Sequence, residues 1–160
     1  MTFRPVSPGA PGARVAMSSN TRILSTTPEQ VWSVLADGWL YPLWVVGASR
    51  MREVDDHWPD VGARLHHSVG SWPMLVNDYT EVLDASPKSM LKLRARTWPA
   101  GEAEVTIRLT PNGTDTEVTM EEQVTSGPVA LIPNRLQDPP LAWRNSESLR
   151  RLAYVTERRP

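Results

Sequence analysis

Residues 138–158 have the sequence DPPLAWRNSESLRRLAYVTER, and the other predicted elements are organised around this segment. Its apolar residues recur at intervals of three and four, which is typical of an amphipathic helix lying on a core. That side of the helix carries Leu141, Ala142, Asn145, Ser148, Leu149, Leu152, Ala153 and Thr156. Asp138 is suited to the N-cap, with Pro139 and Pro140 in the first turn, where a missing N–H has no cost. The sequence therefore predicts a C-terminal helix that begins at Asp138.

A polar side chain interrupts the apolar side of this helix, because Asn145 lies at its centre. The side chains expected to point elsewhere are Trp143, Arg144, Glu147, Arg150, Arg151, Tyr154 and Glu157. A buried amide either completes a hydrogen bond, to a strand carbonyl or to the connector 126–140, or it faces a cavity and orients a ligand carbonyl. The residues leave both alternatives open. They indicate a ligand-binding fold without naming the ligand.

Composition narrows the classes of function. The chain has 160 residues and a net charge of −1 with scattered Arg and Glu, whereas nucleic-acid binding usually leaves a basic patch, so we expect no nucleic-acid partner. No run of about 18 apolar residues is present to form a membrane span. The absence of cysteine excludes disulfides, thiol catalysis and thiolate metal sites. We expect a cytoplasmic protein that is a monomer or a homodimer.

The N-terminal part divides into a tail and the start of a domain. Residues 1–14 are rich in proline and glycine, which predicts a disordered tail, and residues 15–157 are expected to form one domain. Val15–Leu24 has weak strand character. Thr27-Pro28-Glu29-Gln30 is a capping box that starts a helix, with Gly38 expected at its C-cap. Leu40–Val46 predicts a second short helix or a turn.

From Ser49 onward the apolar period changes to two, which predicts strands. The expected strands are Ser49–Asp55, Arg64–Gly70, Met74–Leu83, Met90–Thr97, Ala103–Leu109 and a return strand containing Val118–Val124. Asn112-Gly113 is a strong hairpin signal between the last two. With the first strand, this predicts an α+β fold: a curved seven-stranded antiparallel sheet wrapped around the long C-terminal helix, with two short helices after the first strand. Ser126–Pro140 is either a packed connector or a lid.

Several short motifs lie at the expected turns and packing positions of this predicted fold. They are Val31–Gly38, Trp44–Gly47, Val54-Asp55, Trp58-Pro59, Asn112–Met120 and Arg144–Leu152. Together they resemble the START-like superfamily known as SRPBCC, specifically bacterial polyketide cyclase/dehydratase-type proteins, over about residues 15–157. The resemblance implies the helix-grip fold, with a hydrophobic cavity between the sheet and the last helix. Relatives bind lipids, sterols, polyketides or other apolar molecules, and some cyclise or dehydrate them. The matched residues imply no catalytic residue.

Two titratable residues share a strand face with apolar neighbours. His67 lies on the same face as Leu65 and Val69, and Glu122 on the same face as Met120 and Val124. In an apolar cavity they could act as general base and acid, because burial shifts their pKa values toward the working range. The alternative is a histidine satisfied within the core and a glutamate near solvent. No metal or cofactor is expected, because neighbouring histidines on one strand point to opposite faces and no phosphate-binding glycine loop is present.

The remaining candidates are expected to bind the ligand rather than react with it. The apolar wall beside Asn145 is predicted from Leu141, Leu149, Leu152 and Met120, and the pocket mouth from Trp44, Trp72 and Trp98. These side chains suit a hydrophobic, lipid- or polyketide-like small molecule. The predicted function is therefore binding of such a molecule, and the alternative is a cyclase/dehydratase-type enzyme that uses polar residues of the cavity as acid and base.

Overall fold

The computed structural model describes residues 17–70, 73–97 and 101–159. In chain order the elements are β1 (Met17–Leu24), α1 (Pro28–Leu35), η1 (Gly38–Leu40), α2 (Tyr41–Trp44), β2 (Ala48–Val54), β3 (Arg64–Val69), β4 (Val76–Ser86), β5 (Met90–Thr97), β6 (Gly101–Asn112), β7 (Asp115–Ser126), η2 (Pro128–Leu131) and α3 (Asn134–Glu157). The predicted tail, Trp72 and Trp98 lie outside the described residues. No helix in the described ranges is long and apolar enough to span a membrane.

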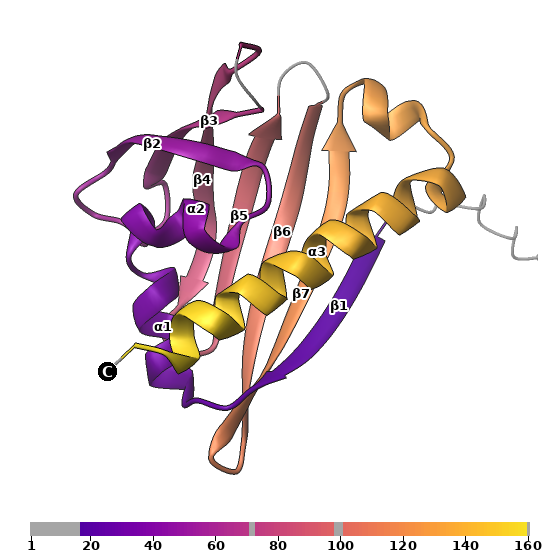
Figure 1. The fold of residues 1–160 in the computed structure, drawn as a ribbon. Coiled ribbons are helices and arrows are strands. Elements are labelled where there is room, and N and C mark those ends of the chain that lie inside the picture. Colours follow the sequence, from indigo (N-terminus) through magenta and orange to yellow (C-terminus); the bar gives the residue numbers. More distant parts are fainter. Residues whose placement is uncertain (1–16, 71–72, 98–100, 160) are drawn as a thin grey trace, which may run out of the picture.

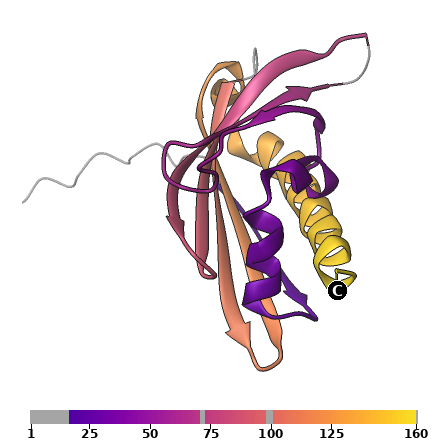
Figure 2. The same cartoon turned by 90° about the vertical axis from the view of Figure 1, so that its left-hand side faces the viewer.

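The seven strands form one antiparallel sheet in the order β1-β7-β6-β5-β4-β3-β2 (Figure 1). Strands β2 to β6 each pair with the next strand in sequence, and β1 lies at the edge of the sheet beside β7. The long helix α3 crosses one face of the curved sheet, and α1 lies on the same side (Figure 2). The predicted α+β helix-grip architecture is confirmed. The hairpin at Asn112 is also confirmed, although Asn112 pairs with Asp115, so that Gly113 and Thr114 form the loop.

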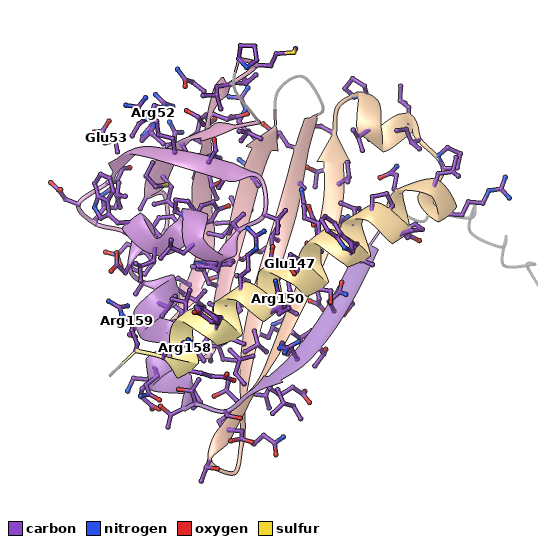
Figure 3. All side chains as sticks on the ribbon, viewed as in Figure 1. Arg52, Glu53, Glu147, Arg150, Arg158 and Arg159 are labelled. Carbon is purple, nitrogen blue, oxygen red and sulfur yellow. The ribbon has the colours of Figure 1, made fainter. Side chains whose placement is uncertain are left out.

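The packed core lies between the sheet, α1 and the C-terminal half of α3. Leu149 and Leu152 of the helix are fully buried there, together with Leu24, Val34 and Ile107. The opposite side of this half of the helix is solvated, and Glu147 and Arg150 lie beside each other on it (Figure 3). Since the apolar residues of α3 fill the space toward its C-terminus, any cavity must lie toward its N-terminus.

The first helix begins as predicted but ends differently. Thr27 Oγ1 accepts from the backbone N–H of Gln30, and the Gln30 side chain accepts from the backbone N–H of Thr27, which completes the capping box. The C-cap is Ala36, so the prediction of Gly38 in that role was wrong. Gly38 is required for packing instead, because a Cβ there would lie 2.5 Å from Leu65 Cδ2.

Helix α3 begins at Asn134, so the predicted start at Asp138 was wrong, and Pro139 and Pro140 lie inside the helix. The additional turn is anchored by Gln137, which is buried and donates from Nε2 to the carbonyl oxygen of Val129 at 2.7 Å. Asp138 does not cap the helix, and its Oδ1 has no hydrogen-bond partner among the described residues. This contact between Gln137 and Val129 stabilises an additional N-terminal turn, so the helix begins four residues before Asp138, where the local sequence signals place its start.

Strand β4 also departs from its predicted range, since it begins at Val76 and continues to Ser86. The extension follows from pairing, because Ser86 lies opposite Met90 in the neighbouring strand. Tyr79, whose direction the sequence left open, lies on the outer face of the sheet between the guanidinium groups of Arg64 and Arg96. The inner face of β4 therefore presents Asp78 and Thr80, which are both buried.

Candidate functional site

A cavity of about 330 Å³ lies between the sheet and the N-terminal half of α3. The segment from Tyr41 to Ala48 closes one side, and strands β3 to β7 supply the floor. Its lining is mainly apolar, with Val45, Val69, Leu93 and Met120 among the contributing residues. Such a cavity, with a few polar groups directed at it, is typical of a small-molecule site.

Three polar side chains that line this cavity are linked to one another, two from the sheet and one from α2. His67 Nε2 lies 2.9 Å from Thr80 Oγ1, and Tyr41 Oη lies 3.2 Å from the same oxygen. The rings of Tyr41 and His67 are stacked with their centroids 5.5 Å apart. The Nδ1 atom of His67 is buried and has no hydrogen-bond partner among the described residues. The imidazole is thus held by one nitrogen while the other is left unpaired.

Burial, modified by nearby charges, determines the protonation of His67. Burial lowers its pKa below the ordinary value of 6.5; the Asp78 carboxylate opposes this effect, and the positive charges of Arg52 and His66 reinforce it. His67 is therefore a neutral imidazole at neutral pH. Burial likewise raises the pKa of Tyr41, so its phenol stays protonated and is able to donate a hydrogen bond.

The helix side of the cavity presents Asn145 and Ser148. Ser148 Oγ accepts from the backbone N–H of Val46 at 3.2 Å, which fastens the helix to the segment after α2. Asn145 is 2% exposed, and its Nδ2 has no hydrogen-bond partner in the described parts of the chain. Among the described residues this amide nitrogen therefore ties the helix neither to a strand nor to the connector, and Asn145 is one of the residues that line the cavity.

An ion pair between a buried acid and a partly exposed arginine connects the sheet to the helix beside this amide. Glu122 on β7 is 2% exposed, and its Oε1 accepts from Arg144 Nη2 on α3. The prediction that Arg144 points away from the core was wrong. Arg144 lines the main cavity and also a smaller one of about 120 Å³, whose walls include Glu122, Val124 and Leu141. The long, flexible side chain of Arg144 reaches inward from the flank of the helix. The inward-facing Glu122 on β7 indicated this contact in the sequence, because a buried carboxylate needs a cation as its partner.

The structure separates the predicted site residues into groups. His67, Trp44, Met120 and Asn145 line the main cavity, whereas Glu122 and Leu141 line the smaller one. Leu149 and Leu152 belong to the packed core and line neither cavity, because they lie one and two turns beyond Asn145. Trp72 and Trp98 lie outside the described residues. The lining residues that sequence reasoning did not select include Tyr41, Thr80, Trp143 and Arg144.

The described residues contain no group of three or more His, Asp or Glu side chains that could hold a metal ion. The polar groups of the residues that line the site include the amide of Asn145, the guanidinium of Arg144, the neutral imidazole of His67 and the hydroxyls of Tyr41, Thr80 and Ser148. These groups can orient a ligand by hydrogen bonds and can move a proton.

Comparison with solved structures finds the same fold in proteins of low sequence identity. Protein CV1439 from Chromobacterium violaceum has a TM-score of 0.66 and 20% identity over 90% of this chain and 99% of its own. Protein MLL2253 from Mesorhizobium loti has a TM-score of 0.68 and 22% identity over 90% and 98%. The di-domain ARO/CYC StfQ from the steffimycin biosynthetic pathway has a TM-score of 0.71 and 10% identity, covering 89% of this chain and 51% of StfQ.

Comparison with curated proteins finds no match. A family defined by sequence does match, over residues 14–157, and its description is polyketide cyclase / dehydrase and lipid transport. The match spans the sheet, the short helices and α3, and therefore every residue of the cavity wall. The chain belongs to the polyketide cyclase / dehydrase and lipid transport family.

Proposed function

We propose that this protein binds an apolar, lipid- or polyketide-like small molecule that carries a hydrogen-bond acceptor, in the cavity between the sheet and α3. The observation that carries the proposal is an apolar cavity of about 330 Å³ whose lining includes two residues that each carry a buried polar atom without a partner among the described residues. Asn145, with its Nδ2, comes from the helix, and His67, with its Nδ1, comes from the sheet. A cytoplasmic location, a bacterial origin, a monomeric or homodimeric state and a single domain over residues 15–157 stay predictions.

The energetic argument rests on the unsatisfied amide. A buried polar group without a partner costs about 1–3 kcal/mol of stability, and proteins generally avoid that cost. A ligand carbonyl that accepts from Asn145 Nδ2 would remove the cost on binding, while the ligand's apolar body contacts Val69, Leu93 and Met120. The free energy that the unpaired amide costs in the unliganded protein would be recovered on binding and would add to the affinity for the ligand.

Filling the cavity tests this proposal. The neutral fluorescent probe N-phenyl-1-naphthylamine should bind the wild-type protein, and Ala95→Phe should weaken binding by about tenfold or more because the new ring occupies the space. Thr110→Phe is the matched control, because Thr110 is exposed and does not line the cavity. Thermal melts confirm that both variants fold. Equal probe affinity in all three proteins would show that the probe does not occupy this cavity and would count against the proposal.

A second candidate function is proton abstraction next to a ligand carbonyl, the first step of an aldol cyclisation. His67 favours it, since a neutral imidazole whose Nε2–H donates to Thr80 Oγ1 leaves Nδ1 as a proton acceptor. In D2O, His67 would take a methyl proton from bound 2-acetylnaphthalene, and the enolate would take up a deuteron. Nuclear magnetic resonance measures the rate of this exchange as the loss of the methyl proton signal. His67→Gln should reduce the rate to that measured in buffer alone. A wild-type rate equal to that in buffer would exclude this chemistry and leave binding intact.

A further inference from the structure

Glu122 is a buried acid that lines the smaller cavity, and its partner Arg144 lines both cavities. Glu122 lies on the inner face of β7 between Met120 and Val124, both buried. Its Oε1 accepts from Arg144, and its Oε2 has no hydrogen-bond partner among residues 17–70, 73–97 and 101–159. A charge buried in this way is costly unless a partner compensates it, so Glu122 and Arg144 act as one neutral unit.

The other cation whose residue lines the main cavity is engaged elsewhere. Arg96 lies with its guanidinium over the outer-face ring of Tyr79, donates to Tyr79 Oη at 3.2 Å and pairs with Glu102 at 3.4 Å. The imidazole of His67 is neutral because burial lowers its pKa. Near it, Arg52 donates to the carbonyl oxygen of Asp78, so the buried acid of β4 also has a cation close by. The charges that act on the cavity are therefore balanced without a ligand.

This balance distinguishes between two kinds of acceptor. A neutral carbonyl can accept from Asn145 Nδ2 and from an N–H of Arg144 other than the one used by Glu122, since a guanidinium has five N–H donors. A ligand carboxylate in the same place would share one guanidinium with Glu122. Two carboxylates would then compete for one partly exposed guanidinium, and among the described residues that line the main cavity the other guanidinium, that of Arg96, is already paired with Glu102.

We propose that Glu122 determines ligand charge: through its ion pair with Arg144, it admits an uncharged carbonyl-bearing ligand and rejects the corresponding carboxylate. The inference rests on the proposed binding function and adds the class of ligand. Arg144 alone would attract anions, and the buried acid on the facing strand converts the same guanidinium into a neutral hydrogen-bond donor. Glu122 is thus a residue that determines specificity, acting through Arg144.

The test uses two probes of nearly equal shape, 2-acetylnaphthalene and 2-naphthoate, titrated by calorimetry at neutral pH. The wild-type protein should bind the ketone about tenfold or more tightly than the carboxylate. Glu122→Gln keeps the shape and the acceptor for Arg144 but frees its positive charge, and it should raise the affinity for 2-naphthoate about tenfold or more while changing that for the ketone less than about threefold.

Two further variants isolate the cause. Glu121→Gln changes the net charge equally on the adjacent residue, which pairs with Arg108 on the outer face at 3.4 Å, and it should leave the preference unchanged. The double variant Glu122→Gln with Arg144→Gln has the wild-type net charge and neither charge of this pair, and it should lose the gain in carboxylate affinity. Thermal melts verify folding of each protein, and the wild-type comparison stands even if Glu122→Gln does not fold.

The outcomes separate the inference from the function on which it rests. Tight ketone binding with a ketone preference that is present in the wild type and lost in Glu122→Gln supports the charge selection. Equal affinity of the wild-type protein for both probes, or the same ratio in the wild type and Glu122→Gln, overturns it and leaves the binding function standing. If neither probe binds any of the proteins, the proposed function fails, and the inference fails with it.

Discussion

Replacing Asn145 with leucine should stabilise the protein and weaken its binding of carbonyl ligands. Asn145 is 2% exposed and lies beside the cavity with its Nδ2 unpaired among the described residues. Removing an unsatisfied buried amide should raise the free energy of unfolding by about 1–3 kcal/mol. Leucine has nearly the same size and a better helix propensity by a few tenths of a kcal/mol, so the substitution introduces neither a void nor a helix break.

The expected change is large enough to measure. For a chain of about this size, each kcal/mol corresponds to about 2–4 °C in Tm, so Asn145→Leu should melt about 2–12 °C above the wild type. Ser146→Leu controls for helix propensity, since Ser146 is the exposed neighbour on the same helix, and it should stay within about 0.5 kcal/mol of the wild type.

Binding measurements on the same variant report the role of the amide. The affinity for 2-acetylnaphthalene should fall about tenfold, which is the worth of one hydrogen bond, while N-phenyl-1-naphthylamine, which has no carbonyl, should be nearly unaffected. Circular dichroism melts and fluorescence titrations supply both quantities. A Tm several degrees below the wild type, with both affinities unchanged, would refute the reasoning, because Asn145 would then hold the helix rather than face a ligand.

Two other predictions concern stability. Burial lowers the pKa of His67 in the folded protein below 6.5, so the unfolded chain binds a proton at this histidine more readily than the folded protein does. The free energy of unfolding is therefore at its full value above pH 6.5 and decreases as the pH falls toward the pKa of the folded state. Urea unfolding at a series of pH values should show this loss, His67→Gln should remove it, and the exposed His57→Gln should not. Gly38→Ala should cost about 1–3 kcal/mol by overpacking, since its Cβ would meet Leu65 Cδ2 at 2.5 Å and Val54 Cγ1 at 2.8 Å, and an unchanged melting temperature would contradict this packing.

The architecture was predictable because its signals are local. The capping box at Thr27, the alternation along β6 and β7 and the hairpin near Asn112 each depend on residues close in sequence. The inward direction of His67 and Glu122 also followed from alternation, and both side chains are buried. Strand and helix periodicity therefore placed these side chains on the correct face without any knowledge of their partners.

The details of the site depend on contacts that the periodicity of a single strand or helix does not reveal. Gln137 bonds to the carbonyl of Val129 and lengthens α3, and Arg144 turns inward because Glu122 lies opposite. The division of α3 into a cavity half at Asn145 and a core half at Leu149 depends on where α1 and the sheet fill the space. A helical wheel assigns a residue to a side of the helix, but it does not show what lies against that side.

The position of β1 beside β7 has a consequence for how the molecule assembles. The bond from Asn20 to the carbonyl of Ala142 joins residues 122 positions apart, and the bond from Thr116 to the carbonyl of Thr26 spans 90 positions. Closing such long loops costs entropy before any contact rewards it, whereas the hairpins from β2 to β7 need only short loops. The meander from β2 to β7 can therefore form early, and the contacts that bring α3 against the sheet form late. A partly folded chain would then have the sheet without the ligand-binding cavity.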